Sequence, residues 1–96
     1  MPHFLVEYRE VGTPETREAH RSAHISYRKG LGDAMILAGP ILDNEGKSVG
    51  SLVILDRDDH DDATAAANED PFVSAKVLEL VSVRSYRIAA IKLPRS

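Results

Sequence analysis

Four residues on one predicted helix carry the chemistry of the first half of the chain. Arg17, Arg21, His24 and Arg28 follow one another at spacings of three and four, so they share one side of a helix. Histidine is the side chain that exchanges a proton near neutral pH. Arg17 or Arg21 beside it can hold an anion or stabilise the charge left when a proton departs. A solvated basic helix face explains the same spacing, and both interpretations stay open.

An aspartate in the second half of the chain is the expected partner of His24. Asp70 precedes Pro71 in the segment EDPF, and proline biases the residue before it toward extended backbone. A carboxylate that is hydrogen-bonded to one imidazole nitrogen orients the ring and raises its basicity. We therefore expect an Asp70 oxygen within about 2.6–3.2 Å of a His24 ring nitrogen, with the other nitrogen facing a cleft.

Further side chains are candidates for binding a small molecule in that cleft. Ser51 follows a glycine within a predicted strand, and a glycine leaves room for a ligand or for close backbone. Tyr27 and Phe72 can flank a planar ligand. Packing against the sheet explains both aromatic residues as well, and Ser51 also fits a tolerated polar position. The predicted binding set comprises Arg17, Arg21, Tyr27, Ser51 and Phe72.

The sequence offers no convincing metal or cofactor site. It lacks cysteine, which excludes thiolate ligands and cysteine nucleophiles. His20 and His24 are four residues apart, but the glutamate of a His-Glu-x-x-His zinc helix is missing. The acidic run DRDDHDD at 56–62 fits the start of a helix, because carboxylates complement the helix dipole. It lacks the ligand spacing of a calcium loop.

Charge and hydropathy narrow the class of protein. The chain has 12 lysines and arginines against 15 aspartates and glutamates, a net charge of −3, whereas nucleic-acid binding needs clustered excess positive charge. Its apolar runs are far shorter than the ~20 residues of a membrane span, and its first residues lack a secretory signal pattern. We expect a cytoplasmic protein with no nucleic-acid or membrane partner.

Turn and cap residues mark the elements that must position the site. Alternation over 3–8 predicts a strand, and Thr13 and Pro14 begin a helix that reaches about residue 29, closed by a left-handed Gly30 or Gly32. The small residues on its other side, Ala19, Ala23 and Ser26, are expected to face the sheet. Apolar runs at 34–42 and 48–55 form a hairpin, in which Pro40 marks an edge or a bulge. A second helix within 61–72 and a last strand over 76–92 complete the order.

This order predicts an α+β, ferredoxin-like βαββαβ fold, an antiparallel four-stranded sheet with two helices on one face, as a single domain over 1–96. A chain this short buries only about 60–65% of its surface. The opposite sheet face then has no cover within the chain. Because two-fold dimers are the commonest oligomers, we expect a homodimer through that face.

Four segments, AHRSAHISY, AGP, EDPF and VSVRSYR, occur in an order and spacing that resemble the YCII-related family. The resemblance extends over nearly the whole chain. It implies a ferredoxin-like subunit that pairs into a dimeric α+β barrel, with His24 and Asp70 matching the histidine and aspartate of the family cleft. It also implies lyase-like or isomerase-like steps on small, often aromatic compounds, although some members look non-enzymatic or regulatory.

The leading hypothesis is an enzyme that uses His24 and Asp70 for cofactor-free proton transfer on a small anionic or phenolic molecule. The alternative is a ligand-binding or regulatory dimeric module that catalyses nothing, since a His–Asp pair is also a structural hydrogen bond. A purely structural dimerisation unit would leave the arginines around the histidine unexplained.

Overall fold

Four strands and the helices between them follow the predicted order in the computed structural model, which describes residues 2–92. The ends of the predicted domain, residues 1 and 93–96, lie outside the described residues. The elements are β1 (His3–Glu10), α1 (Pro14–Gly30), the 3-10 turn η1 (Gly32–Ala34), β2 (Met35–Leu42), β3 (Ser48–Asp56), α2 (His60–Asn68), α3 (Pro71–Ser74) and β4 (Leu78–Tyr86).

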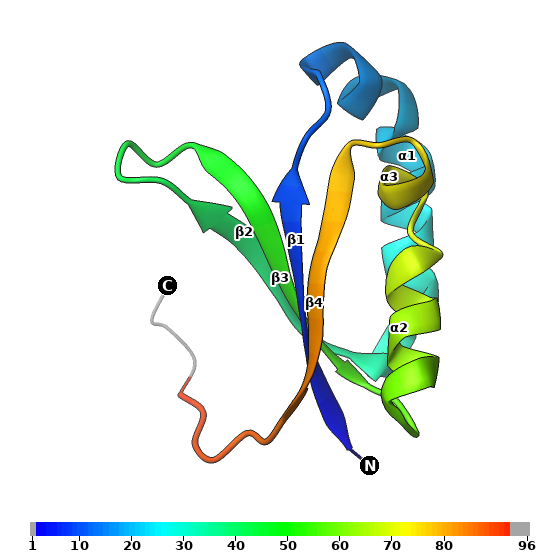
Figure 1. Cartoon of the computed structure of the whole chain (residues 1–96), viewed down its shortest axis with the longest axis vertical. Helices are drawn as coiled ribbons and strands as arrows, with labels where there is room; N and C mark the ends of the chain where they lie inside the picture. The colour runs from blue at the N-terminus through cyan, green and yellow to red at the C-terminus, as the bar shows by residue number, and fades with distance from the viewer. Residues whose placement is uncertain (1, 93–96) are drawn as a thin grey trace.

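The strands form one antiparallel sheet in the order β2-β3-β1-β4, and the helices cover one of its faces (Figure 1). The ferredoxin-like α+β fold of the subunit is therefore confirmed, while the dimeric barrel stays a prediction. The strand that contains Pro40 lies at the sheet edge, where a missing amide donor is tolerated. None of the helices within residues 2–92 is long and apolar enough to cross a membrane.

Local signals account for where α1 and α2 begin. The Thr13 side chain accepts the N–H of Thr16 at 3.2 Å, and Pro14 occupies the first turn of α1. Asp59 caps α2 by accepting the N–H of Asp62 at 2.8 Å, so the acidic run does start a helix. Of the two expected glycine caps, only Gly32 is left-handed, with φ +55°.

The prediction of which face of α1 packs against the rest of the protein is wrong. Ala19, Ala23 and Ser26 are exposed, whereas the opposite side, with Tyr27 and Arg28, is half-buried. The reason is that the side chains on the packed face end in polar groups, and these groups form hydrogen bonds with other parts of the chain. The Tyr27 hydroxyl donates a hydrogen bond to the carbonyl of Ala66 in α2. The Arg28 guanidinium donates to the buried carboxylate of Asp70.

The last helix and strand differ from the predicted bounds. The second helical segment divides into α2 and α3, because Pro71 starts a new helix after an extended residue. The last strand ends at Tyr86 rather than near residue 92. Tyr86 pairs with His3, the first residue of β1, so later residues have no strand opposite them.

The core lies between the sheet and the helices. Alternate β1 side chains, Phe4, Val6 and Tyr8, point into it, and Val6 pairs across with Val53 of β3. Alanines of α2 at 63, 66 and 67 are fully buried, which lets this helix approach the sheet closely. The Tyr8 hydroxyl donates to the carbonyl of Ala67 at 3.0 Å, so the centre of the core also has a satisfied polar group.

Candidate functional site

A buried carboxylate stands at the junction of α2 and α3. Asp70 has no solvent-exposed surface and adopts the extended backbone, φ −61° and ψ 126°, that the following proline favours. Its Oδ1 accepts the N–H of Phe72 at 2.9 Å and so caps α3. The cap holds the carboxylate within hydrogen-bond distance of side chains of α1.

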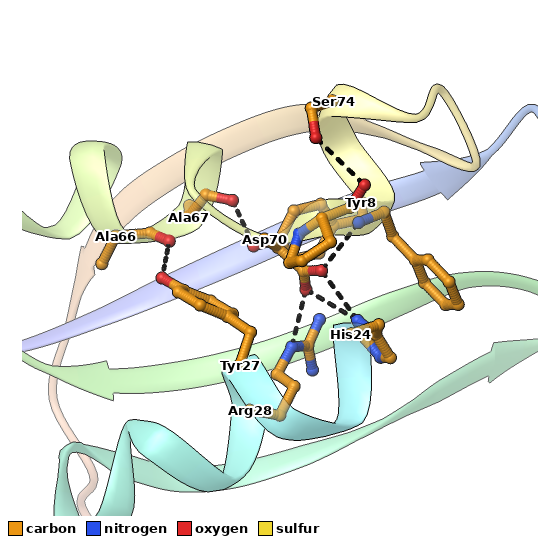
Figure 2. A network of polar contacts seen from close by, with 10 residues as sticks. Tyr8, His24, Tyr27, Arg28, Ala66, Ala67, Asp70 and Ser74 are labelled. Atoms are coloured by element: carbon orange, nitrogen blue, oxygen red, sulfur yellow. Dashed lines mark hydrogen bonds and ion pairs between the residues drawn. The ribbon is translucent and has the colours of Figure 1, made fainter. Parts of the chain in front are cut away.

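Two side chains of α1 bind this carboxylate, as Figure 2 shows. His24 Nδ1 lies 2.7 Å from Oδ1 and 3.0 Å from Oδ2 of Asp70. Arg28 Nε donates to Oδ2 at 2.9 Å. The contact expected between His24 and Asp70 is therefore present, and the arginine one turn further along α1 shares it.

The protonation state of this group follows from its hydrogen bonds. Burial raises the pKa of Asp70, but hydrogen bonds from His24, from the backbone N–H of Phe72 and from Arg28 outweigh it and leave the pKa below its ordinary value. Asp70 is thus a carboxylate, which only accepts hydrogen bonds. The proton of a neutral His24 therefore sits on Nδ1, and Nε2 keeps a lone pair.

Aromatic side chains hold both donors from α1. The His24 ring stacks on Phe72, with centroids 3.9 Å apart and planes 5° apart. The Arg28 guanidinium carbon lies 5.5 Å from the centroid of the Tyr8 ring. Desolvation in this core raises the pKa of the Tyr8 hydroxyl, so the ring stays neutral beneath the guanidinium. His24 and Arg28, which both bond to Asp70, are therefore each also in contact with an aromatic ring.

A cavity of about 320 Å³ opens beside His24, at the lower end of the range for small-molecule sites. One wall consists of side chains from the helices and the other of β2 and β3. Its lining includes Arg17, His24, Arg28, Gly50, Ser51 and Phe72. Such a space suits a compound of about one ring.

Five of the seven predicted site residues gather around this cavity. Arg17 and Ser51 line it together with His24 and Phe72, and Asp70 lies behind His24. Arg17 also forms an ion pair with Glu10. Close backbone, rather than ligand room, explains the glycine before Ser51, because a Cβ there would meet the Tyr8 carbonyl oxygen at 2.4 Å.

The other two predicted binding residues, Arg21 and Tyr27, do not line this cavity. Arg21 is exposed and borders a second depression, which Arg17, His24 and Phe72 also line. Tyr27 bonds to α2 through its hydroxyl. Arg28, in contrast, was not predicted as a site residue. The available signal was its position four residues after His24 on the same helix face.

In the part of the chain that the structure describes, no three His, Asp or Glu side chains gather closely enough to hold a metal ion. The donors that do meet, one imidazole and one carboxylate, are instead joined to an arginine. The prediction that the protein uses no cofactor stays a prediction.

The fold and this cleft define a small α+β protein with an imidazole–carboxylate pair beside a cavity. The sequence model of the YCII-related domain matches residues 1–87, so the chain belongs to the YCII-related family, which confirms the resemblance seen in the four motifs. No curated protein sequence matches the chain.

Among solved structures, the chain is similar to 5-chloro-2-hydroxyhydroquinone dehydrochlorinase from Burkholderia phenoliruptrix, in complex with 2,5-dihydroxybenzoquinone. The match has a TM-score of 0.63 and 21% sequence identity, and it covers 88% of this chain and 91% of the other. At this identity the likeness shows a shared fold.

Proposed function

We propose that this protein is a small enzyme that transfers a proton to or from a small anionic or phenolic molecule, with His24 and Asp70 as its catalytic pair. One observation carries the proposal: the wall of the cavity includes an imidazole whose Nδ1 is held at 2.7 Å by a buried, ionised carboxylate. This arrangement leaves Nε2 as the basic atom of the ring.

The proposed step needs only this pair and the ligand. Nε2 of His24 takes a proton from a ligand O–H or an acidic C–H, and the bonding electrons stay on the ligand as a phenolate or enolate. Asp70 remains ionised and stabilises the imidazolium that forms. Return of the proton to another ligand atom completes an isomerisation, whereas departure of a leaving group with its electron pair completes an elimination.

The family and the structural neighbour support a small-molecule substrate. The neighbour is a dehydrochlorinase in complex with 2,5-dihydroxybenzoquinone, a planar acidic compound. Arg17 lines the same cavity as His24 and adds positive charge to it. Ser51 contributes a hydroxyl from the strand wall. These features favour ligands with an ionised phenolic or enolic oxygen over uncharged ligands.

Deuterium exchange tests the proposed proton transfer without knowledge of the natural substrate. The ring hydrogens of 2,5-dihydroxybenzoquinone in D₂O are followed by NMR with and without protein. We expect the wild-type protein to accelerate exchange and His24→Gln to lose about 10²–10⁴-fold of that acceleration. His20→Gln is the matched control, because His20 is an exposed histidine of the same helix. Equal rates for wild-type protein and His24→Gln would contradict the proposal.

The alternative, a ligand-binding or regulatory module without catalysis, is favoured by one observation. Asp70 also caps α3 and anchors two side chains of α1, so the pair has a structural role whether or not it reacts. A protein that binds the quinone but does not accelerate exchange would support this alternative. A cytoplasmic location and the absence of a nucleic-acid partner stay predictions.

A further inference from the structure

We infer that Arg28 anchors an acidic oxygen of the ligand and so selects molecules that carry a phenolate, enolate or carboxylate oxygen near the atom that exchanges its proton with His24. The inference rests on the proposed function and adds to it a binding residue and a substrate class. The two arginines that line the cavity, Arg17 and Arg28, differ in how far they are exposed.

Arg28 is buried more deeply than Arg17. The Arg28 side chain is 13% exposed, against 40% for Arg17. Its Nε donates to the buried carboxylate at 2.9 Å, and its guanidinium lies over the Tyr8 ring. Arg17 likewise pairs with a carboxylate, Glu10, and lies 5.5 Å from the centroid of the Phe72 ring, so the two arginines differ mainly in burial. A fixed cation with its orientation already set is the better anchor, since little freedom is lost when the ligand binds.

Part of the guanidinium has no protein acceptor. Arg28 Nη2 is buried, and no acceptor among residues 2–92 forms a hydrogen bond with it. A guanidinium stays protonated in proteins and presents five N–H donors, and a buried donor without an acceptor is unfavourable. Nη2 has almost no accessible surface in this conformation, so a small shift of the Arg28 side chain toward the cavity that it lines is needed before a ligand oxygen there becomes its acceptor and relieves this cost.

The charges of the site favour an anion at the same place. The negative charge of Asp70 and the positive charge of Arg28 cancel while His24 is neutral. When His24 accepts a proton, the three residues together carry one positive charge. An oxygen anion on the ligand restores neutrality inside a partly buried site, where unpaired charge is unfavourable.

Helix geometry limits how far apart the two reacting parts of the ligand lie. His24 and Arg28 are one turn apart on α1, a rise of about 6 Å, and both bond to Asp70. The oxygen bound by Arg28 and the proton exchanged with His24 therefore belong to the same small ring or to atoms attached to it. The inferred substrates are cyclic or short enols and phenols.

A pair of probes tests this assignment by calorimetric titration. 2,5-Dihydroxybenzoquinone carries acidic oxygens, and 2,5-dimethoxybenzoquinone is its uncharged methyl ether. We expect the wild-type protein to prefer the acid and Arg28→Met to weaken binding of the acid about 10- to 100-fold while changing that of the ether little. Lys29→Met is the matched control, because Lys29 is the neighbouring, exposed cation.

Arg28→Lys keeps a positive charge but loses the planar guanidinium with its several N–H donors, so we expect an intermediate loss of affinity for the acid. This variant also provides the comparison if Arg28→Met does not fold. An unchanged preference for the acid in both variants, or an equal loss of both probes, would overturn the role of Arg28 and leave the proposed function standing. Failure of the wild-type protein to bind either probe would instead contradict the proposed function and this inference together.

Discussion

The rings of His24 and Phe72 are stacked with their centroids 3.9 Å apart and their planes within 5° of parallel. Phe72 also donates its backbone N–H to Asp70, the residue that holds His24 Nδ1. The short segment around Pro71 therefore holds the imidazole by its edge through Asp70 and by its face through Phe72. Ring orientation and the start of α3 depend on the same residues.

Phe72→Leu removes the flat surface against His24 but keeps an apolar side chain. We expect the free energy of unfolding to fall by about 1–2 kcal/mol and the exchange rate to fall as well, because the imidazole loses one of its two supports. Phe4→Leu is the comparison, since Phe4 is equally buried in β1 and does not line the cavity. Equal exchange rates for the two variants would show that the stack does not orient His24.

Asp70→Asn removes the charge that both donors of α1 share. We expect a loss of about 1–3 kcal/mol in the free energy of unfolding, measured with urea, because a buried guanidinium then faces a neutral amide. Asp61→Asn changes an exposed carboxylate in the first turn of α2 and should lose under about 1 kcal/mol. A loss no larger for Asp70→Asn than for Asp61→Asn would contradict a stabilising role of the triad that His24, Arg28 and Asp70 form.

The lowered pKa of Asp70 predicts how stability depends on pH. Burial opposes ionisation, but the hydrogen bonds win and the pKa of the folded state lies below the ordinary value of 3.8. The resulting stabilisation is complete above that value and is lost as the pH falls through the folded-state pKa. Urea unfolding at pH 6 and pH 3 should therefore show a smaller decrease for Asp70→Asn than for the wild-type protein.

A second carboxylate also has a lowered pKa and provides the control. The backbone N–H groups of Lys47 and Glu45 hold the pKa of Asp43 below its ordinary value. Asp43→Asn therefore removes a similar titration at an exposed turn. If Asp70→Asn retains the full acid sensitivity of the wild-type protein while Asp43→Asn loses it, the buried triad is not the source.

The fold was predictable because its signals are local. Thr13 with Pro14, the turn at 43–47 and the strand alternation each reflect the backbone preferences of a few neighbouring residues. The contact between His24 and Asp70 is different, since the two residues lie 46 positions apart. It could be predicted only by combining the strand and helix order with the family motifs.

The inner face of α1 could not be predicted because its packing contradicts the usual apolar pattern. Small residues such as Ala23 remain exposed, whereas Tyr27 and Arg28 turn inward because a carbonyl and a carboxylate from the second half of the chain satisfy their polar tips. Those partners are not visible in the sequence of the helix. For the same reason Arg21 was predicted to line the cleft and Arg28 was not.

Gly50→Ala tests how closely the cavity wall is packed. An added Cβ would lie 2.4 Å from the Tyr8 carbonyl oxygen across the β1–β3 pair, so the strands must separate. We expect a loss of about 1–3 kcal/mol in the free energy of unfolding, typical of overpacking. Gly39→Ala on the adjacent strand meets nothing within 4 Å and should be nearly neutral. Similar stabilities for both variants would contradict this packing.

We propose that two copies of the chain pair through the sheet face opposite the helices. Leu37 of β2 and Val81 of β4 are 43% and 51% exposed, and strand pairing aligns Leu37 with Ile54 on that face. Exposed apolar area of this kind favours association, although the face also carries an ion pair between Glu7 and Arg84.

Light scattering at micromolar concentration should therefore give twice the mass of one chain. Leu37→Asp should shift the protein toward the single-chain mass, because it places a charge in the proposed interface, which pairing would bury. Ile25→Asp provides the control, since Ile25 is a comparably exposed apolar residue on α1, on the helix side of the sheet. A wild-type protein with the mass of one chain would contradict the dimer, and an equal effect of both substitutions would place the interface elsewhere.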